Sequence, residues 1–320
     1  MRKSRPTGCG GQKRKGKMHP QTAGAGLKAE KTRAVLALLL TMFFWGTSAV
    51  FMRTTALTLT PENALALRYI VLVLMAVPGL LITGQWRIAR QHWPRLILTG
   101  LGMFGSSWFT IQGFARVAAG LGTVISMVEP IIIALLFWAV LREPLSSRIW
   151  AGLSVSLAGS AVLFWPDITA STANPVDRMG ILFLLAAPTC WAVFTIGAKP
   201  LLSHYSGFAI TAWSMLLSAP LILFMASTPY VELFRTTAPR TWVELIYLAA
   251  FNSLLGAVLW NYGTKHLPGA AAGSFLYLLP VIAIGAGYLI LGEPITPWLV
   301  AGGAIMLVGV ALAQSGSRGH

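Results

Sequence analysis

One segment of this chain occurs twice. Residues 120–164 read GLGTVISMVEPIIIALLFWAVLREPLSSRIWAGLSVSLAGSAVLF, and residues 270–314 read AAAGSFLYLLPVIAIGAGYLILGEPITPWLVAGGAIMLVGVALAQ. Aligned without a gap, the two copies match Pro130 with Pro280, Glu143-Pro144 with Glu293-Pro294, Gly152 with Gly302, and Gly159 with Gly309. Each copy is an apolar run, a short Glu-Pro turn and a second apolar run rich in small residues. We therefore predict two pairs of membrane-spanning helices, each joined by a tight hairpin, in an internally duplicated chain.

The composition excludes a soluble globular protein. Of the 320 residues, 56% are hydrophobic and only 10% are charged, whereas soluble domains carry roughly 25% charged residues. Apolar runs of about 20 residues, the length that crosses about 30 Å of hydrocarbon, recur along the whole sequence. We predict an all-α integral membrane protein.

The net charge of +15 is concentrated near the N-terminus, because residues 1–33 contain ten of the 24 Lys and Arg. This segment is rich in Gly, Lys and Gln, which is typical of disorder, and it lacks the apolar region and cleavage site of a signal peptide. It also lacks aromatic residues that could stack on nucleic acid bases. We interpret it as a basic, disordered cytoplasmic tail that sets the orientation of the protein.

Ten apolar runs separated by turn signals predict ten membrane spans. They cover residues 34–52, 63–83, 94–115, 119–141, 148–165, 178–199, 208–228, 241–264, 268–291 and 297–314. With the N-terminus in the cytoplasm, 18 of the 24 Lys and Arg fall on the cytoplasmic side and six on the other, in agreement with the positive-inside rule. We therefore expect a multi-pass protein of the cytoplasmic (inner) membrane with both termini in the cytoplasm.

The duplication extends over two five-span repeats, residues 34–165 and residues 178–314. Trp45 in the first span has Trp191 as its counterpart in the sixth, and Gln112-Gly113 has Tyr262-Gly263. Because five is an odd number, the second repeat must enter the membrane inverted relative to the first. Inverted repeats place a pseudo-two-fold axis in the membrane plane and a cavity at their interface. This architecture favours a transporter that works by alternating access.

Several short motifs carry a family resemblance. They are Phe44-Trp45-Gly46, Gln112-Gly113-Phe114-Ala115-Arg116, Pro130 with Leu141-Arg142-Glu143-Pro144, Tyr262-Gly263-Thr264-Lys265-His266, and Pro280 with Leu291-Gly292-Glu293-Pro294. Together they resemble the drug/metabolite transporter superfamily, and within it the ten-helix EamA-type branch, over about residues 34–314. The resemblance implies export of small metabolites across the cytoplasmic membrane without ATP. The many aromatic residues make the chain look most like bacterial exporters of aromatic and other neutral amino acids.

Glu129 lies ten residues into the fourth predicted span, close to the membrane midplane. A carboxylate at this depth costs a few kcal/mol and usually faces a cavity or a partner. It could bind a substrate ammonium group or carry a proton, or it could be a protonated structural carboxyl, and the sequence leaves these alternatives open. Pro130 and Pro280 each remove a helical hydrogen bond, so each predicts a kink that could serve a gate or only shape packing.

Aromatic and amide side chains inside the spans predict a substrate-binding cavity. With Glu129, the candidates are Trp45, Trp108, Gln112, Trp191, Asn252, Trp260 and Tyr277. Amides at membrane depth need hydrogen-bond partners, and aromatic faces suit planar or apolar side chains and cations. The competing interpretation is that tryptophans anchor the chain at the membrane interfaces. Arg68 also has two interpretations, pairing with a substrate carboxylate or snorkelling to the headgroups, and we slightly favour snorkelling.

Two further patterns concern packing and missing chemistry. Gly152, Ser156 and Ser160 predict a small-residue ridge that lets two helices approach closely. The sequence has no phosphate-binding loop with Lys and Ser/Thr, no cluster with metal-ligand spacing, and no convincing Ser-His-carboxylate set. We therefore predict no metal, no cofactor, no nucleic acid partner and no enzyme activity.

The leading hypothesis is a secondary transporter that exports small amphipathic metabolites, with aromatic or neutral amino acids favoured, by alternating access. One alternative is an exporter of drugs or quaternary amines with the same fold, because Glu129 with aromatic residues could equally hold a lipophilic cation. An alternative of another class is a membrane enzyme that acts on a lipid-linked substrate. Proton coupling stays open, and ten spans suffice for a complete cavity in one chain.

Overall fold

The computed structural model describes residues 20–56, 58–114, 116, 125–166, 169, 177–291 and 295–316. All regular structure in these ranges is helical, and they contain no β-strand, so the all-α prediction is confirmed for this part of the chain. The second Glu-Pro turn, Glu293-Pro294, lies outside the described residues, as do residues 1–19 of the predicted tail and residues 119–124 of the predicted fourth span.

In the described residues, the first half contains five helices of 13 residues or more. They are α1 (Pro20–Ala56), α2 (Pro61–Ile82), α3 (Trp93–Phe114), α5 (Glu129–Leu141) and α6 (Ser147–Leu163), and the 3-10 turn η1 (Arg90–His92) precedes α3. Helix α1 begins at Pro20, earlier than the predicted span edge at residue 34. Proline is favoured in the first turn of a helix, and no proline interrupts residues 21–33. Residues 20–33, which the sequence predicted as part of the disordered tail, are therefore helical.

The second half is more segmented. It contains α8 (Arg178–Leu201), α9 (Gly207–Phe224), α10 (Tyr230–Thr236), α11 (Pro239–Tyr247), η2 (Leu248–Leu255), α12 (Gly256–His266), α13 (Gly269–Ser274), η3 (Phe275–Leu278), α14 (Leu279–Ala286), η4 (Gly287–Leu291) and α15 (Pro297–Gly316). The segments η2 and η4 are π-helical. Segments α11, η2 and α12 follow one another without a break, and so do α13, η3, α14 and η4.

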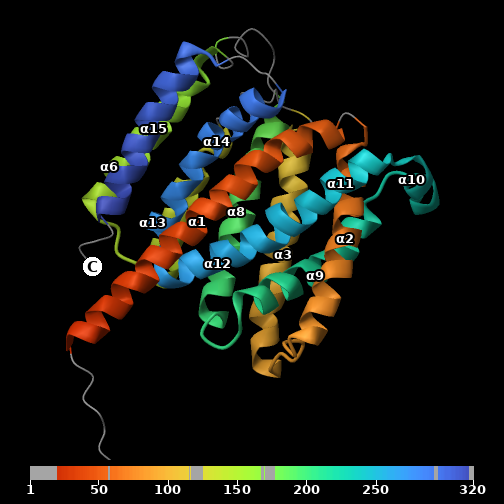
Figure 1. Ribbon diagram of the computed structural model, residues 1–320, viewed down its shortest axis with the longest axis horizontal. Helices are drawn as coiled ribbons and strands as arrows, with labels where there is room; N and C mark the ends of the chain where they lie inside the picture. Colours follow the sequence, from red (N-terminus) through yellow and green to blue (C-terminus); the bar gives the residue numbers. More distant parts are fainter. Residues whose placement is uncertain are drawn as a thin grey trace, which may run out of the picture.

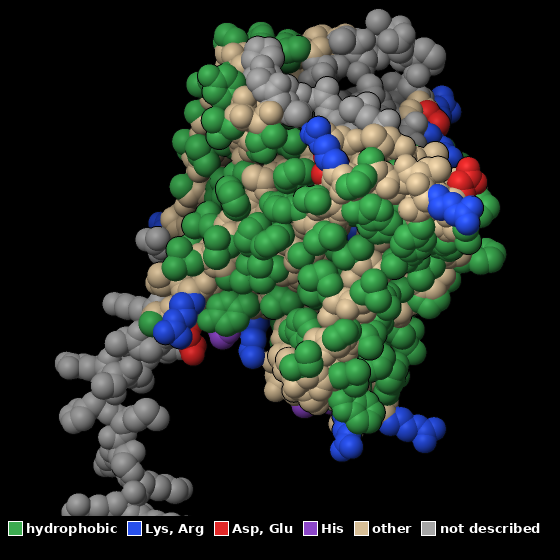
Figure 2. All heavy atoms as spheres, turned by 45° about the vertical axis from the view of Figure 1, so that its right-hand side comes forward, with side chains coloured by type: hydrophobic (Ala, Val, Ile, Leu, Met, Phe, Trp, Pro, Cys, Tyr) green, Lys and Arg blue, Asp and Glu red, His purple; other side chains and the backbone are tan. Residues whose placement is uncertain are grey.

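Seven helical stretches of the described residues are long and apolar enough to cross a membrane. They are Ala29–Met52, Pro61–Ile82, Arg178–Leu201, Gly207–Phe224, Pro239–His266, Gly269–Ile290 and Pro297–Gly316. Helices α3, α5 and α6 occupy the other three predicted ranges. Helix α5 is apolar but shorter than the seven stretches above. Figure 2 shows hydrophobic side chains over the middle of one face of the molecule, with most charged side chains toward its two ends.

The two halves of the chain pack into each other. Two counterpart pairs contact each other directly, because α6 packs along α15 and α2 against α9 (Figure 1). Other contacts come in matched pairs. The contact of α3 with α8 corresponds to that of α12 with α1, and the contact of α5 with α8 corresponds to that of α14 with α1. Exchanging the two halves leaves this set of packed helices unchanged.

The closest of these contacts lies between α6 and α15. A Cβ atom on Gly152 would lie 2.6 Å from the carbonyl oxygen of Gly309, and one on Gly159 would lie 2.9 Å from that of Gly302. Between these two points, the Ser156 hydroxyl donates a hydrogen bond to the Met306 carbonyl at 3.2 Å.

Each of these two glycine contacts maps onto the other when the halves are exchanged, since Gly152 is the counterpart of Gly302 and Gly159 that of Gly309. The predicted ridge residues Gly152, Ser156 and Ser160 are all buried. The ridge is therefore confirmed as a packing surface.

We expect Gly152→Ala to destabilise the protein by about 1–3 kcal/mol, the usual cost of overpacking. The new methyl group would lie 2.4 Å from the Ala313 nitrogen, and backbone cannot move aside as a flexible side chain can. The measurement is the thermal unfolding midpoint of the purified protein in detergent.

The matched control is Gly303→Ala in α15, because a Cβ there would make only an ordinary contact at 3.5 Å with Val281. Equal midpoints for the two variants would contradict the assigned backbone contact between α6 and α15.

Candidate functional site

Three of the predicted tryptophans meet in the interior, one each from α1, α8 and α12. Trp45 lies edge-on to Trp191 with ring centroids 5.2 Å apart, and Trp260 lies 5.6 Å from Trp45 and 6.1 Å from Trp191. These separations are typical of favourable aromatic pairs. Trp260 is fully buried and the other two are half-buried. Because Trp45 and Trp191 are counterparts, this tryptophan cluster lies where the two halves meet.

The cluster is positioned by η2 and the start of α12. The Trp45 indole N–H donates to the Asn252 carbonyl at 2.8 Å, within a π-helical segment whose backbone hydrogen bonds are shifted from the α-helical pattern. The indole can approach this closely only because position 256 is glycine, since a Cβ there would lie 2.3 Å from Trp45 Nε1. Asn252, a predicted site residue, thus contributes its backbone carbonyl to the cluster.

The three indole N–H groups of the cluster are not equivalent. Those of Trp45 and Trp260 are satisfied within the protein, the latter by the Thr195 hydroxyl at 3.1 Å. Trp191 Nε1 is buried and has no hydrogen-bond partner among the described residues, and the same holds for the hydroxyl of Tyr277. An unpaired buried donor costs about 1–3 kcal/mol. Trp191 and Tyr277 therefore offer hydrogen bonds that a ligand or a water molecule could take.

Glu129 is the first residue of α5, and Pro130 lies in the first turn of this helix. Residues 127 and 128 form a turn before it, so the span is interrupted at the point where the sequence predicted a kink. Pro280 has the matching place at the start of α14, after the 3-10 segment η3. The Glu129 side chain is half-buried, and its carboxylate has no hydrogen bond or ion pair with a described residue.

Gln112 and Trp108 lie at the end of α3 and do not join the tryptophan cluster. The Gln112 amide donates to the Glu62 carboxylate at 3.1 Å and accepts a hydrogen bond from Arg116. It thereby ties the end of α3 to the start of α2. Trp108, one turn earlier in α3, is half-buried and makes no ring contact with Trp45, Trp191 or Trp260.

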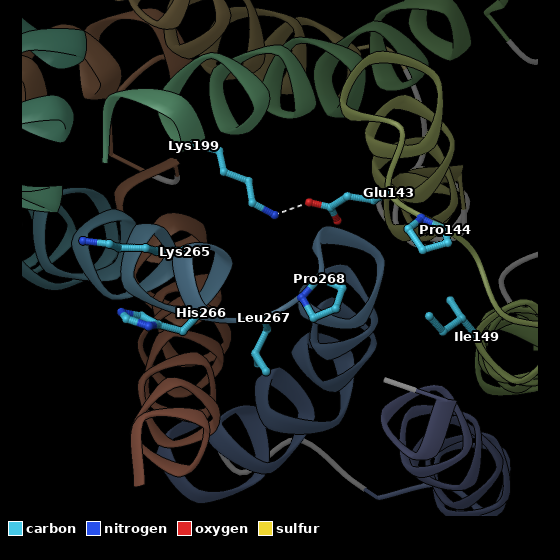
Figure 3. A pocket seen from close by; sticks show the side chains of 8 residues that line it. All are labelled: Glu143, Pro144, Ile149, Lys199, Lys265, His266, Leu267 and Pro268. Atoms are coloured by element: carbon cyan, nitrogen blue, oxygen red, sulfur yellow. Dashed lines mark hydrogen bonds and ion pairs between the residues drawn. The ribbon is translucent and has the colours of Figure 1, made fainter. Parts of the chain in front are cut away.

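A second polar group of residues surrounds the Glu143 carboxylate, at the hairpin between α5 and α6 (Figure 3). Arg142 ends α5 with a left-handed backbone conformation, at φ 56°. Glu143 follows it and pairs with Lys199 of α8, and it also accepts a hydrogen bond from the Gly269 N–H at 2.7 Å. The Lys199 ammonium in addition lies 4.9 Å from the ring centroid of Phe137.

These contacts join the first-half hairpin to two elements of the second half. A pocket of about 290 Å³ opens beside them, and its lining includes Lys265, His266 and Pro268. Figure 3 shows Glu143 and Lys199 directed toward each other, while Lys265 and His266 point away from them. From the sequence, Glu143 was expected only as part of a Glu-Pro turn, and no partner was predicted for it or for Lys199. Their pairing was missed because it links residues from opposite halves.

Comparison with known proteins identifies the family. The model of the EamA-like transporter family matches the chain twice, over residues 32–165 and over residues 178–314. The chain belongs to the EamA-like transporter family. The resemblance inferred from the paired motifs is confirmed.

Named relatives of this EamA-like protein cover nearly all of it. A probable terminal-alkyne amino-acid exporter of Streptantibioticus cattleyicolor is 26% identical over 297 residues, which is 90% of this chain and 96% of the relative. An uncharacterized transporter of Archaeoglobus fulgidus is 27% identical over 282 residues, 86% of this chain and 96% of the relative. A solved crystal structure of another protein superposes with a TM-score of 0.75 at 19% identity, over 90% of this chain and 98% of that one.

Family membership and the helical spans together make this EamA-like protein an integral, multi-pass membrane transporter. Its cargo is therefore a small molecule. The tryptophan cluster, with the unpaired Trp191 N–H and the π-helical segment η2 beside it, is the candidate place where that molecule binds.

Proposed function

We propose that this protein is a secondary transporter that exports small amphipathic metabolites across the inner membrane by alternating access. Aromatic and other neutral amino acids are the favoured substrates. The observation that carries this proposal is the tryptophan cluster at the meeting point of the two halves, where the Trp191 N–H has no partner within the described residues. Indole faces bind apolar or planar groups, and the unpaired N–H donates to a polar one.

The proposed architecture is ten transmembrane helices in two five-helix repeats of inverted topology. It is supported by the set of packed helices, which exchange of the halves leaves unchanged, and by a helix in each of the ten predicted ranges. The start of α1 and the end of α15 point to the same end of the bundle in Figure 1, as an even number of spans requires. With the basic tail in the cytoplasm, both termini are cytoplasmic.

The proposed substrate class rests on Glu129, on the aromatic residues and on one named relative. Glu129 supplies an unpaired carboxylate that suits a substrate ammonium group. The relative that is named as a probable terminal-alkyne amino-acid exporter supports amino acids as the cargo class. The same carboxylate with aromatic rings also suits a quaternary amine or another lipophilic cation, and this is the second candidate function. We propose no catalytic reaction and no cofactor.

The Glu143 contacts supply a gate for alternating access. They link the hairpin of the first repeat to α8 and α13 of the second, and the Glu143 and Lys199 side chains are each only 21% exposed. In the proposed orientation this hairpin faces the cytoplasm. Any motion that separates the repeats there must break the ion pair and the hydrogen bond from Gly269, so these bonds hold the cytoplasmic side closed.

Counterflow tests the transport function. Vesicles containing only this protein and loaded with an unlabelled amino acid are expected to take up the labelled compound from outside, in a panel that includes phenylalanine. Trp191→Phe keeps an aromatic ring but removes the N–H, and we expect KM to rise about tenfold, since a hydrogen bond to a charged group contributes about 1.5–3 kcal/mol.

Trp86→Phe is the control, because Trp86 lies outside the cluster and is 48% exposed. Saturable uptake without counterflow for any amino acid or amine in the panel would refute the secondary transporter. Repeating the assay on Glu129→Gln with and without a pH gradient separates ammonium binding from proton coupling.

Glu143→Gln tests the gate. Leu267 lines the pocket beside the ion pair and is only 7% exposed. In a protein with Leu267→Cys as its single cysteine, Glu143→Gln is expected to raise the rate of labelling from the cytoplasmic side about tenfold. That factor corresponds to a shift of about 1.4 kcal/mol toward the open state.

Arg148→Gln is the control, since Arg148 is an exposed charge on the neighbouring α6. The gate assignment is wrong if Glu143→Gln and Arg148→Gln leave the labelling rate equally unchanged.

A further inference from the structure

Arg68 lies in α2 on the helix face that packs into the protein core. Leu65 and Leu72, three residues before it and four after it, belong to the main core and are 3% and 0% exposed. Residues at this spacing share a helix face. The outward face of α2 carries Leu74 and Leu81 instead, which are 67% and 62% exposed. Arg68 therefore points inward, which argues against the snorkelling that the sequence slightly favoured.

The guanidinium group of Arg68 has no partner in the described part of the chain. Its Nε atom is buried and forms no hydrogen bond, and none of the ion pairs among the described residues includes Arg68. An arginine stays charged in proteins and carries five N–H donors. A charge inside a membrane span is costly unless it is paired or faces a water-filled cavity. The described residues therefore supply no compensating negative charge for Arg68.

The second repeat provides an internal comparison. The alignment that pairs Trp45 with Trp191 pairs Arg68 with Ser214, and it also pairs the first residues of α2 and α9. Ser214 is buried, and its hydroxyl is bonded to the Thr99 hydroxyl at 2.7 Å and to the Ile210 carbonyl at 2.7 Å. The fold therefore accommodates a neutral side chain at this position, and that side chain forms its hydrogen bonds within the protein. Packing does not explain why the first repeat carries a cation.

We propose that Arg68 is the residue that binds the carboxylate of the substrate. A planar guanidinium can donate two parallel hydrogen bonds to a carboxylate, which a lysine cannot do. The inference rests on the proposed transport function and narrows it, because a site with an inward arginine selects an acid or a zwitterion over a lipophilic cation. It thereby favours amino acids over quaternary amines as the cargo.

The test compares amino acids with the amines that remain when their carboxylate is removed. The pairs are phenylalanine with phenethylamine, tryptophan with tryptamine, and tyrosine with tyramine. Binding to the purified full-length chain is followed by the shift of the thermal unfolding midpoint, in a detergent without phosphate groups so that no lipid headgroup competes. At least one amino acid is expected to bind at least tenfold more tightly than its amine, and Arg68→Gln is expected to remove this preference.

Two further variants keep the test decisive. Arg68→Lys keeps the positive charge but not the paired donors, so amino acid binding should weaken several-fold even if Arg68→Gln does not fold. Arg95→Gln removes an exposed cation near the start of α3 and should leave binding unchanged.

The inference is overturned if the amines bind to the wild-type protein as tightly as the amino acids do. It is also overturned if the Arg68→Lys variant binds the amino acids with the wild-type affinity. In both cases counterflow would persist and the transport function would stand. If no compound of either kind binds or exchanges, the proposed function fails, and this inference fails with it.

Discussion

Helices α6 and α15 pack with their backbones in direct contact, and this contact constrains how the two halves of the chain pack together. Any side chain larger than hydrogen at Gly152 or Gly309 would collide with the opposite helix. The contact is also symmetric, because the Gly152–Gly309 pair becomes the Gly302–Gly159 pair when the halves are exchanged. The same exchange relates α3 on α8 to α12 on α1. One relation between the halves thus accounts for the packing at the edge of the bundle and for the meeting of Trp45 with Trp191 at its centre.

Within this frame, the buried polar groups fall into two classes. Some form hydrogen bonds within the protein, as Trp260 does with Thr195 and Thr99 with Ser214. Others, namely the Trp191 N–H and the Arg68 Nε–H, are buried without a partner among the described residues, and the half-buried Glu129 carboxylate is unpaired as well. A helical bundle that served only stability would give each such group a hydrogen-bond partner inside the protein, since unpaired polar atoms are costly away from water. A transporter must leave some of these polar groups unpaired so that its cargo can bind to them.

Local features of the sequence predicted much of the fold. Apolar run lengths located the helices, the small-residue spacing at Gly152 and Ser156 located a packing ridge, and the duplication paired Trp45 with Trp191. Long-range partners were not predictable from one sequence. The Glu143–Lys199 ion pair joins opposite halves, and the Gln112–Glu62 bond joins two helices whose facing sides no local pattern reveals. The inward side of Arg68 was hidden for another reason: in a membrane helix both the lipid face and the core face are apolar, so periodicity does not distinguish them.

The inverted relation of the repeats is the central claim, and the sidedness of the two hairpins tests it most directly. With Cys9 and Cys190 replaced by serine, single cysteines are placed by Ser147→Cys and Ile295→Cys. Both positions are exposed and lie beside the helix caps Ser146 and Thr296, which stay intact. A membrane-impermeant maleimide is then applied to right-side-out and inverted vesicles. We predict that Ser147→Cys reacts only from the cytoplasmic side and Ile295→Cys only from the opposite side, whereas reaction of both from one side would contradict the inverted repeat.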